Sequence, residues 1–152
     1  MATAEFLREL LDELDEANAE CDGVTRLVST VLARNDVEHQ VYAGGILRSS
    51  ETGGKDLLMD RHFWVECGAL RIDYRARMWL GDDDCVPHGV HSPDQYPLIA
   101  YAGKPVYMEP LSDPLFSIIL NKDGYDFSEY FPEVRATSVN EPGSKSKGPG
   151  LG

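Results

Sequence analysis

The chain begins with two amphipathic segments. In the first, apolar residues recur at the spacing of a helix, with mostly acidic residues between them, at Phe6, Leu7, Leu10, Leu11 and Leu14. In the second, the apolar positions are Val24, Leu27, Val28, Val31 and Leu32. Asn18 or Asp22 is suited to cap this second helix, and Arg34 and Asn35 are suited to close it. We therefore expect two N-terminal helices, each with one apolar face.

After these helices the period changes to two. Apolar and polar residues alternate over 37–43, which predicts a strand that ends in a kink at Gly44. Two further runs, 62–66 and 70–75, are short and rich in aromatic and β-branched residues, and they lie on either side of Gly68. They predict a β-hairpin.

In the C-terminal half, glycine, aspartate and proline residues interrupt the pattern too often for long elements. Two short strands are predicted over 98–101 and 105–108. Ser112 precedes a proline and is placed to cap a helix over 115–120, although the isoleucines there also permit a strand.

The composition is that of a folded domain. Of the 152 residues, 42% are apolar and 26% are charged, which is close to the globular average and excludes wholesale disorder. The length fits one domain, which we assign to 1–135. Residues 136–152 have almost no apolar side chains to offset the entropy of ordering, and they predict a flexible tail.

Charge narrows the range of partners. The chain has 14 basic and 26 acidic residues, a net charge of -12, so electrostatics oppose direct binding to nucleic acid or an anionic membrane. It has no apolar run of the roughly 18 residues that cross a membrane, and its charged start does not resemble a signal peptide. We expect a cytoplasmic protein. Its cysteines are odd in number and widely spaced, which predicts free thiols at Cys21, Cys67 and Cys85.

Cys21 stands where the second helix is expected to begin. It precedes Val24 by three residues and Val28 by seven, so its thiol would project from the first turn along the face that packs on the sheet. The free N–H groups and the dipole of a helix N-terminus favour the thiolate, which is the nucleophilic form of cysteine. The alternative is a small buried residue that fills the interface between helix and sheet.

The hairpin supplies partners for such a thiol. A turn centred between Cys67 and Gly68 places His62 directly opposite Asp73, with their Cβ atoms about 4.5–5.5 Å apart on one face. Asp73 would then orient the imidazole and stabilise its charged form, as a base for a cysteine nucleophile requires. In another register, His62 is an ordinary strand histidine and Asp73 a partner for a nearby arginine.

The order of these features resembles the transglutaminase-like branch of the papain-like cysteine enzyme superfamily. The segments that carry the resemblance are 21–32, 37–45 (VEHQVYAGG) and 62–73 (HFWVECGALRID). The resemblance implies a papain-like core in which Cys21 attacks an amide or thioester-like carbonyl. It also implies that His62 acts as base and then acid, and that Asp73 orients His62.

Other residues have secondary assignments. The nucleophile's own backbone N–H is a natural donor to the oxyanion, and Asn18 is a side-chain candidate for the same task as well as a candidate cap. Trp64 shares the face of the strand histidine and would either line a substrate groove or pack in the core. Cys67 points to the opposite face and is assigned a structural role.

We expect neither a metal nor a cofactor. Three residues at three-residue intervals resemble zinc ligands, but they lie in an irregular loop and have no fourth ligand at a diagnostic spacing: Cys85, His88 and His91.

Two functions remain open from the sequence. The first is a small cytosolic cysteine hydrolase or acyltransferase that forms an acyl-enzyme on Cys21 and acts on a protein or a small amide or acyl compound. The second is a non-enzymatic acidic protein, such as an inhibitor that mimics nucleic acid, which binds a basic protein partner from a papain-like scaffold without activity. Both imply an α+β fold in which the N-terminal helices pack on a mainly antiparallel sheet.

Overall fold

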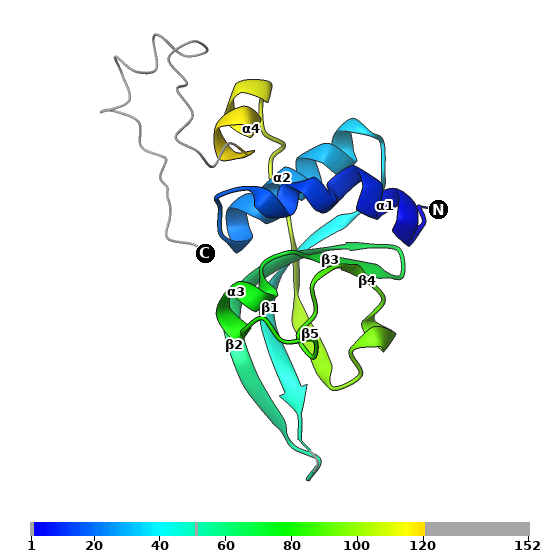
Figure 1. Ribbon diagram of the computed structural model, residues 1–152, viewed down its shortest axis with the longest axis vertical. Helices are drawn as coiled ribbons and strands as arrows, with labels where there is room; N and C mark the ends of the chain where they lie inside the picture. The colour runs from blue at the N-terminus through cyan, green and yellow to red at the C-terminus, as the bar shows by residue number, and fades with distance from the viewer. Residues whose placement is uncertain (1, 51, 121–152) are drawn as a thin grey trace, which may run out of the picture.

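The computed structural model describes residues 2–50 and 52–120. Within these residues the chain forms four α-helices and one antiparallel sheet of five strands, so the predicted α+β class is confirmed. In Figure 1, α1 (Ala4–Leu11) and α2 (Cys21–Arg34) lie together across one end of the sheet, and α4 (Asp113–Leu120) lies beyond α2. The predicted tail and its boundary at residue 136 lie outside the described residues.

Both predicted N-terminal helices are present. Helix α1 is capped by Thr3, whose hydroxyl accepts a hydrogen bond from the Phe6 N–H, and it continues into a short 3₁₀ helix, Asp12–Glu16. Helix α2 begins at the predicted cysteine, but Glu20 occupies its N-cap position and no side chain caps it. The prediction that Asn18 or Asp22 caps α2 is therefore wrong.

The sheet has the strand order β4-β3-β2-β1-β5, and every neighbouring pair is antiparallel. Its strands are β1 (Gln40–Ser49), β2 (Lys55–Cys67), β3 (Leu70–Asp73), β4 (Gly89–His91) and β5 (Ile99–Val106). The predicted hairpin of 62–66 and 70–75 is confirmed as the end of β2 and the whole of β3. Figure 1 shows β1 and β2 as one long, twisted pair of strands.

Strand β1 does not end at the glycine pair as predicted. It runs through Gly44 and Gly45 to Ser49, with a shift of register between Gly44 and Ile46. A Cβ atom at Gly44 would lie 2.2 Å from the carbonyl oxygen of Ala102 on β5. Glycine is needed there because two strands approach closely, and that requirement comes from a partner nearly 60 positions away rather than from a local bend.

The two faces of the sheet are packed differently. Because side chains alternate along a strand, Val65 and Cys67 of β2 face α1 and α2, where they join a large apolar cluster with Leu7, Leu11 and Leu27. The opposite face carries His62 and Trp64 from β2 together with residues of β1, β3 and β5. The candidate base therefore lies on the face that is richer in polar and aromatic groups.

The C-terminal part differs from the prediction in one element. A single strand, β5, replaces the two short strands expected over 98–101 and 105–108. Pro105 does not end the strand, because β5 lies at the edge of the sheet, where a missing N–H donor is tolerated. The helix expected over 115–120 is confirmed as α4, and the Ser112 hydroxyl accepts a hydrogen bond from the Leu115 N–H.

None of the helices in residues 2–50 and 52–120 is both long and apolar enough to cross a bilayer.

Candidate functional site

The β2–β3 hairpin brings His62 and Asp73 together, although not in the predicted register. Cys67 pairs with Leu70, so the turn is centred after Gly68, which has a φ of 61° that suits glycine. The prediction that His62 and Asp73 are directly paired is therefore wrong. They are diagonal neighbours on one face, and long side chains bridge such diagonals. Nε2 of His62 lies 2.7 Å from Oδ2 of Asp73.

Asp73 accepts four hydrogen bonds. Its Oδ2 receives the His62 ring and the Tyr101 hydroxyl, both at 2.7 Å. Its Oδ1 receives the backbone N–H groups of Arg75 at 2.9 Å and Ala76 at 3.1 Å. Burial alone raises the pKa of Asp73, but the charge of His62 and these hydrogen bonds outweigh burial and lower it. The carboxylate is therefore a buried anion with all its neighbours arranged as donors.

His62 is held in its charged form by the same contact. Burial lowers the pKa of the ring, but the charge of Asp73, its hydrogen bond and an interaction with Cys21 outweigh burial and raise the pKa of His62 to about 9. At neutral pH the ring is therefore an imidazolium that donates through Nε2 to Asp73. This is the state that a carboxylate orienter is expected to produce.

Cys21 adjoins the same ring. The thiol belongs to the first residue of α2, and its proximity contributes to the raised pKa of His62. Asp73 occupies Nε2, and Nδ1 is buried without a well-formed hydrogen bond to any described residue. Nδ1 is thus the ring nitrogen left for the thiol. The structure brings the three residues Cys21, His62 and Asp73 into one cluster.

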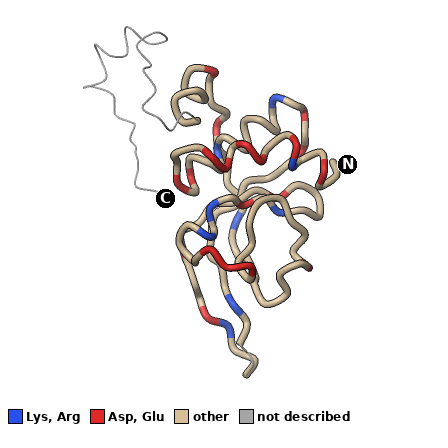
Figure 2. Tube along the Cα trace, viewed as in Figure 1, with Lys and Arg blue, Asp and Glu red and all other residues tan. Residues whose placement is uncertain are grey.

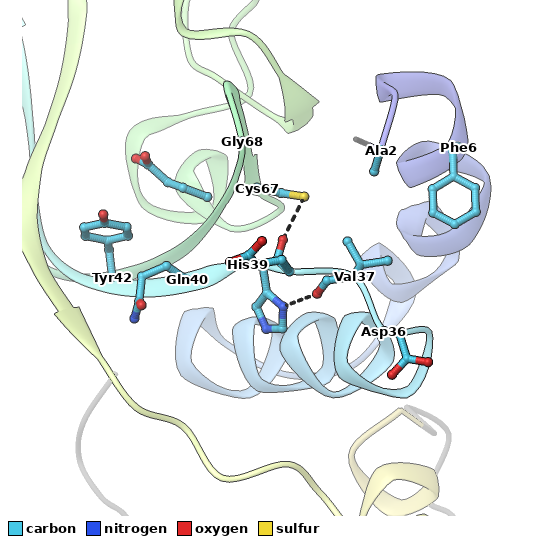
Figure 3. Close-up of a pocket in the computed structure, with 11 residues that line it drawn as sticks. Ala2, Phe6, Asp36, Val37, His39, Gln40, Tyr42, Cys67 and Gly68 are labelled. Carbon is cyan, nitrogen blue, oxygen red and sulfur yellow. Dashed lines mark hydrogen bonds between the residues drawn. The ribbon is translucent and has the colours of Figure 1, made fainter.

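All three side chains are inaccessible in this structure. Cys21, His62 and Asp73 have exposed fractions of 1%, 1% and 3%. A cavity of about 840 Å³ lies elsewhere, between α1 and the start of β1, where Cys67 donates to the Glu38 carbonyl and His39 bonds that of Val37 (Figure 3). Neither this cavity nor the two smaller ones described, of about 470 and 380 Å³, is lined by the three residues.

Aromatic rings pack around the pair. Trp64 stacks on Tyr42 with ring centroids 5.9 Å apart and meets the edge of Tyr101 at 4.9 Å. Its ring also lies against His62, at 6.3 Å. Trp64 is fully buried and lines none of the three cavities, so here it packs within the core and does not line a groove. It shields the ion pair from water, which strengthens the attraction between the two charges.

The remaining candidates make no hydrogen bond to Cys21, His62 or Asp73 among the described residues. Asn18 is exposed in the segment before α2, and it makes no hydrogen bond to a described residue. His88 bonds the carboxylate of Asp15 at 2.9 Å, and His91 bonds the carbonyl of Gly89 at 2.9 Å. Residues 2–50 and 52–120 contain no cluster of three side chains suited to bind a metal ion.

Sequence reasoning missed Tyr101. It was placed at the end of a short strand with no role, whereas its hydroxyl bonds the candidate orienter. Its pKa is raised, first by burial and then by the charge of Asp73, so it stays a neutral donor. No local signal could have revealed this contact, because it depends on the side chain reaching across from the edge strand β5 to β3.

Comparisons with protein-family models, with curated proteins and with solved structures give no match for this chain.

Proposed function

We propose that the protein is a cysteine hydrolase or acyltransferase that acts on an amide or thioester-like carbonyl. The observation that carries the proposal is the 2.7 Å contact between His62 and Asp73, with Cys21 near enough to the same ring to raise its pKa. A nucleophile, a base and an orienting carboxylate, in that spatial order, are the components of nucleophilic acyl transfer. The resemblance to transglutaminase-like enzymes assigns the same three roles.

Each residue has a defined task in the proposed reaction. The sulfur of Cys21 attacks the carbonyl carbon as a thiolate, and His62 donates its Nδ1 proton to the leaving nitrogen as the C–N bond breaks. Water or an acceptor amine then attacks the thioester and gives a proton to His62, while the C–S bond breaks and the thiolate returns. Asp73 keeps the ring oriented and compensates its positive charge throughout.

The oxyanion needs donors as well. The backbone N–H of Cys21, in the first turn of α2, has no acceptor within the helix and is aimed away from the helix body. Asn18 remains the side-chain candidate, since it is exposed and has no partner that holds it elsewhere among the described residues. Substrate access requires movement of the groups that cover the thiol, because Cys21 is buried.

Acyl transfer from an activated ester tests this proposal. The protein is mixed with p-nitrophenyl acetate at pH 7, and the acetyl group is located by mass mapping after short reaction times. We expect acetylation of Cys21 before Cys67 or Cys85, and we expect Asp73→Asn to slow it. Acetylation that favours the exposed Cys85, with Cys21 unmodified, would overturn the proposal.

A second function is favoured by the burial of the three residues. None of the three cavities described lies at the thiol, whereas acidic residues, red in Figure 2, follow α1 and the 3₁₀ helix after it. The candidate is a non-enzymatic protein that binds a basic partner. Binding to a cationic peptide such as polylysine should then weaken strongly with salt and be unchanged in Cys21→Ala. Binding that ignores salt would contradict it.

A further inference from the structure

Arg75 links the two halves of the candidate site. It follows Asp73 by two residues, at the point where the chain leaves β3, and its own backbone N–H donates to the Asp73 carboxylate at 2.9 Å. Its side chain extends in the other direction, toward the segment that precedes Cys21. The side chain has an exposed fraction of only 7%.

The Arg75 guanidinium uses all five of its N–H donors. Nε bonds the carbonyl of Ala19 at 2.7 Å, and Nη2 bonds those of Ala17 at 2.7 Å and Asp15 at 2.9 Å. Nη1 bonds the Asp15 carboxylate and the Tyr74 carbonyl, both at 2.7 Å. Three alternate backbone carbonyls between residues 15 and 19 are thus fixed to one planar group.

The segment that Arg75 holds determines where α2 begins. Ala19 lies two residues before Cys21, and a Cβ atom on Gly23 would come within 2.8 Å of the Ala19 Cβ, so the segment is folded tightly against the first turn of the helix. Displacement of residues 15–19 must therefore displace the start of α2. The distance between the thiol and the His62 ring changes with it.

From these contacts we infer that Arg75 is a positioning residue, which sets the location of the Cys21 thiol relative to the His62–Asp73 pair. The inference rests on the function proposed above, but it concerns geometry and can be tested without turnover. Lysine cannot replace arginine in this role, because its single ammonium group cannot reach four carbonyl oxygens and a carboxylate that are arranged around a planar fork.

The test measures the interaction between Cys21 and His62 directly. The pKa of the His62 ring is determined by NMR titration in the full chain, with and without Cys21→Ala. In the wild type, loss of the thiol should lower the pKa of His62, because Cys21 raises it. In Arg75→Lys, we expect Cys21→Ala to have little further effect, since the thiol has moved from the ring. The His62–Asp73 contact should survive, because the donors to Asp73 are backbone groups and Tyr101.

Arg77→Lys is the matched control. Arg77 bonds the carbonyl of Val86 at 2.9 Å and the carboxylate of Asp82 at 3.4 Å, so the same substitution two residues away leaves residues 15–19 untouched. The effect of Cys21→Ala on the His62 pKa should be the same in Arg77→Lys as in the wild type. The inference would be overturned if Cys21→Ala lowered the His62 pKa in Arg75→Lys as much as in the wild type. It would also be overturned if Arg77→Lys abolished that change to the same extent as Arg75→Lys.

Asp15→Asn provides a second variant should Arg75→Lys fail to fold. It weakens one of the five contacts and keeps the four carbonyl acceptors, so we expect a partial loss of the effect. His88→Gln is its control, because Asp15 also bonds His88. If Cys21→Ala changes the His62 pKa in Asp15→Asn as much as in the wild type, Arg75 does not position the thiol. The result is independent of the proposed chemistry, which fails separately if wild-type Cys21 does not accept an acyl group.

Discussion

Two buried thiols in different surroundings provide the most informative comparison in this molecule. Cys67 faces α1 and α2, where it packs among aliphatic side chains and donates weakly to the Glu38 carbonyl at 3.4 Å. Burial, and then the charge of Glu38, raise its pKa. Cys21 is no more exposed, yet it meets a charged imidazole that is held by a buried carboxylate.

The difference lies in the electrostatic surroundings of the two thiols and not in their burial. An apolar environment disfavours the thiolate of Cys67, whereas Cys21 lies beside a ring that Asp73 holds in its charged form. The sheet keeps these environments apart because side chains alternate along β2, which places Cys67 and His62 on opposite faces. Each prediction below alters one side of this comparison and leaves the other as its control.

The largest effect, on the rate of Cys21 acetylation, is expected from His62→Gln. Glutamine can still donate to Asp73 but cannot transfer a proton, so the rate of Cys21 acetylation by p-nitrophenyl acetate should fall by roughly 10²- to 10⁴-fold. The reaction of Cys67, measured in the same samples by mass mapping, should not change. A Cys21 rate that stays within a factor of about two of the wild type would remove His62 from the proposed reaction.

The next effect is on stability as a function of pH. The pKa of His62 is raised from 6.5 in the unfolded chain to about 9 in the folded protein, so the folded state binds the proton more tightly. The resulting contribution is fully present below the unfolded pKa and is lost as the pH rises through about 9. This contribution to the free energy of unfolding amounts to about 3 kcal/mol.

Urea unfolding between pH 6 and pH 10 measures this loss, with His62→Gln as the control. The wild type should lose stability across this range, and the variant should lose markedly less. If the two pH profiles run parallel, the His62–Asp73 ion pair does not form in solution.

A smaller loss of stability is expected from Tyr101→Phe, which removes one of the four donors to Asp73 without changing the ring. The loss of one donor to a buried carboxylate should lower the free energy of unfolding by about 1–3 kcal/mol. Tyr42→Phe is a control, because Tyr42 contributes ring stacking to the same face. Equal losses in the two variants would mean that the Tyr101 hydroxyl does not support the carboxylate.

The smallest effect is expected from Cys67→Ala. Only a buried sulfur is removed, so the free energy of unfolding should fall by about 1 kcal/mol, as measured by urea unfolding. The acetylation rate of Cys21 should be unchanged. A large fall in that rate would show that the two faces of the sheet are coupled.

Much of the fold was predictable because its signals are local. The helical spacing from Phe6 to Leu14 and from Val24 to Leu32 produces α1 and α2, and the runs on either side of Gly68 produce the hairpin. The passage of β1 through Gly44 was not predictable, because it depends on close approach to Ala102 of a strand much later in the chain.

The candidate site was predictable only in part. The proximity of His62 and Asp73 follows from their place on one hairpin, although the predicted pairing was shifted along the strand. The contacts made by Tyr101 and Arg75 join segments that no local pattern connects. Side chains that support a site from distant elements must be found in the structure.

One competitive labelling experiment tests the central claim most directly. The native protein is treated with a limiting amount of iodoacetamide at pH 7, and alkylation of its three cysteines is followed in the same sample by mass spectrometry. Cys85 is exposed and serves as the standard for an ordinary thiol, while Cys21 and Cys67 are both buried. The account predicts that Cys21 reacts first and that Cys67 reacts last. If reactivity instead follows exposure, with Cys85 first and the two buried thiols equally slow, Cys21 is a packing residue and the proposed chemistry is wrong.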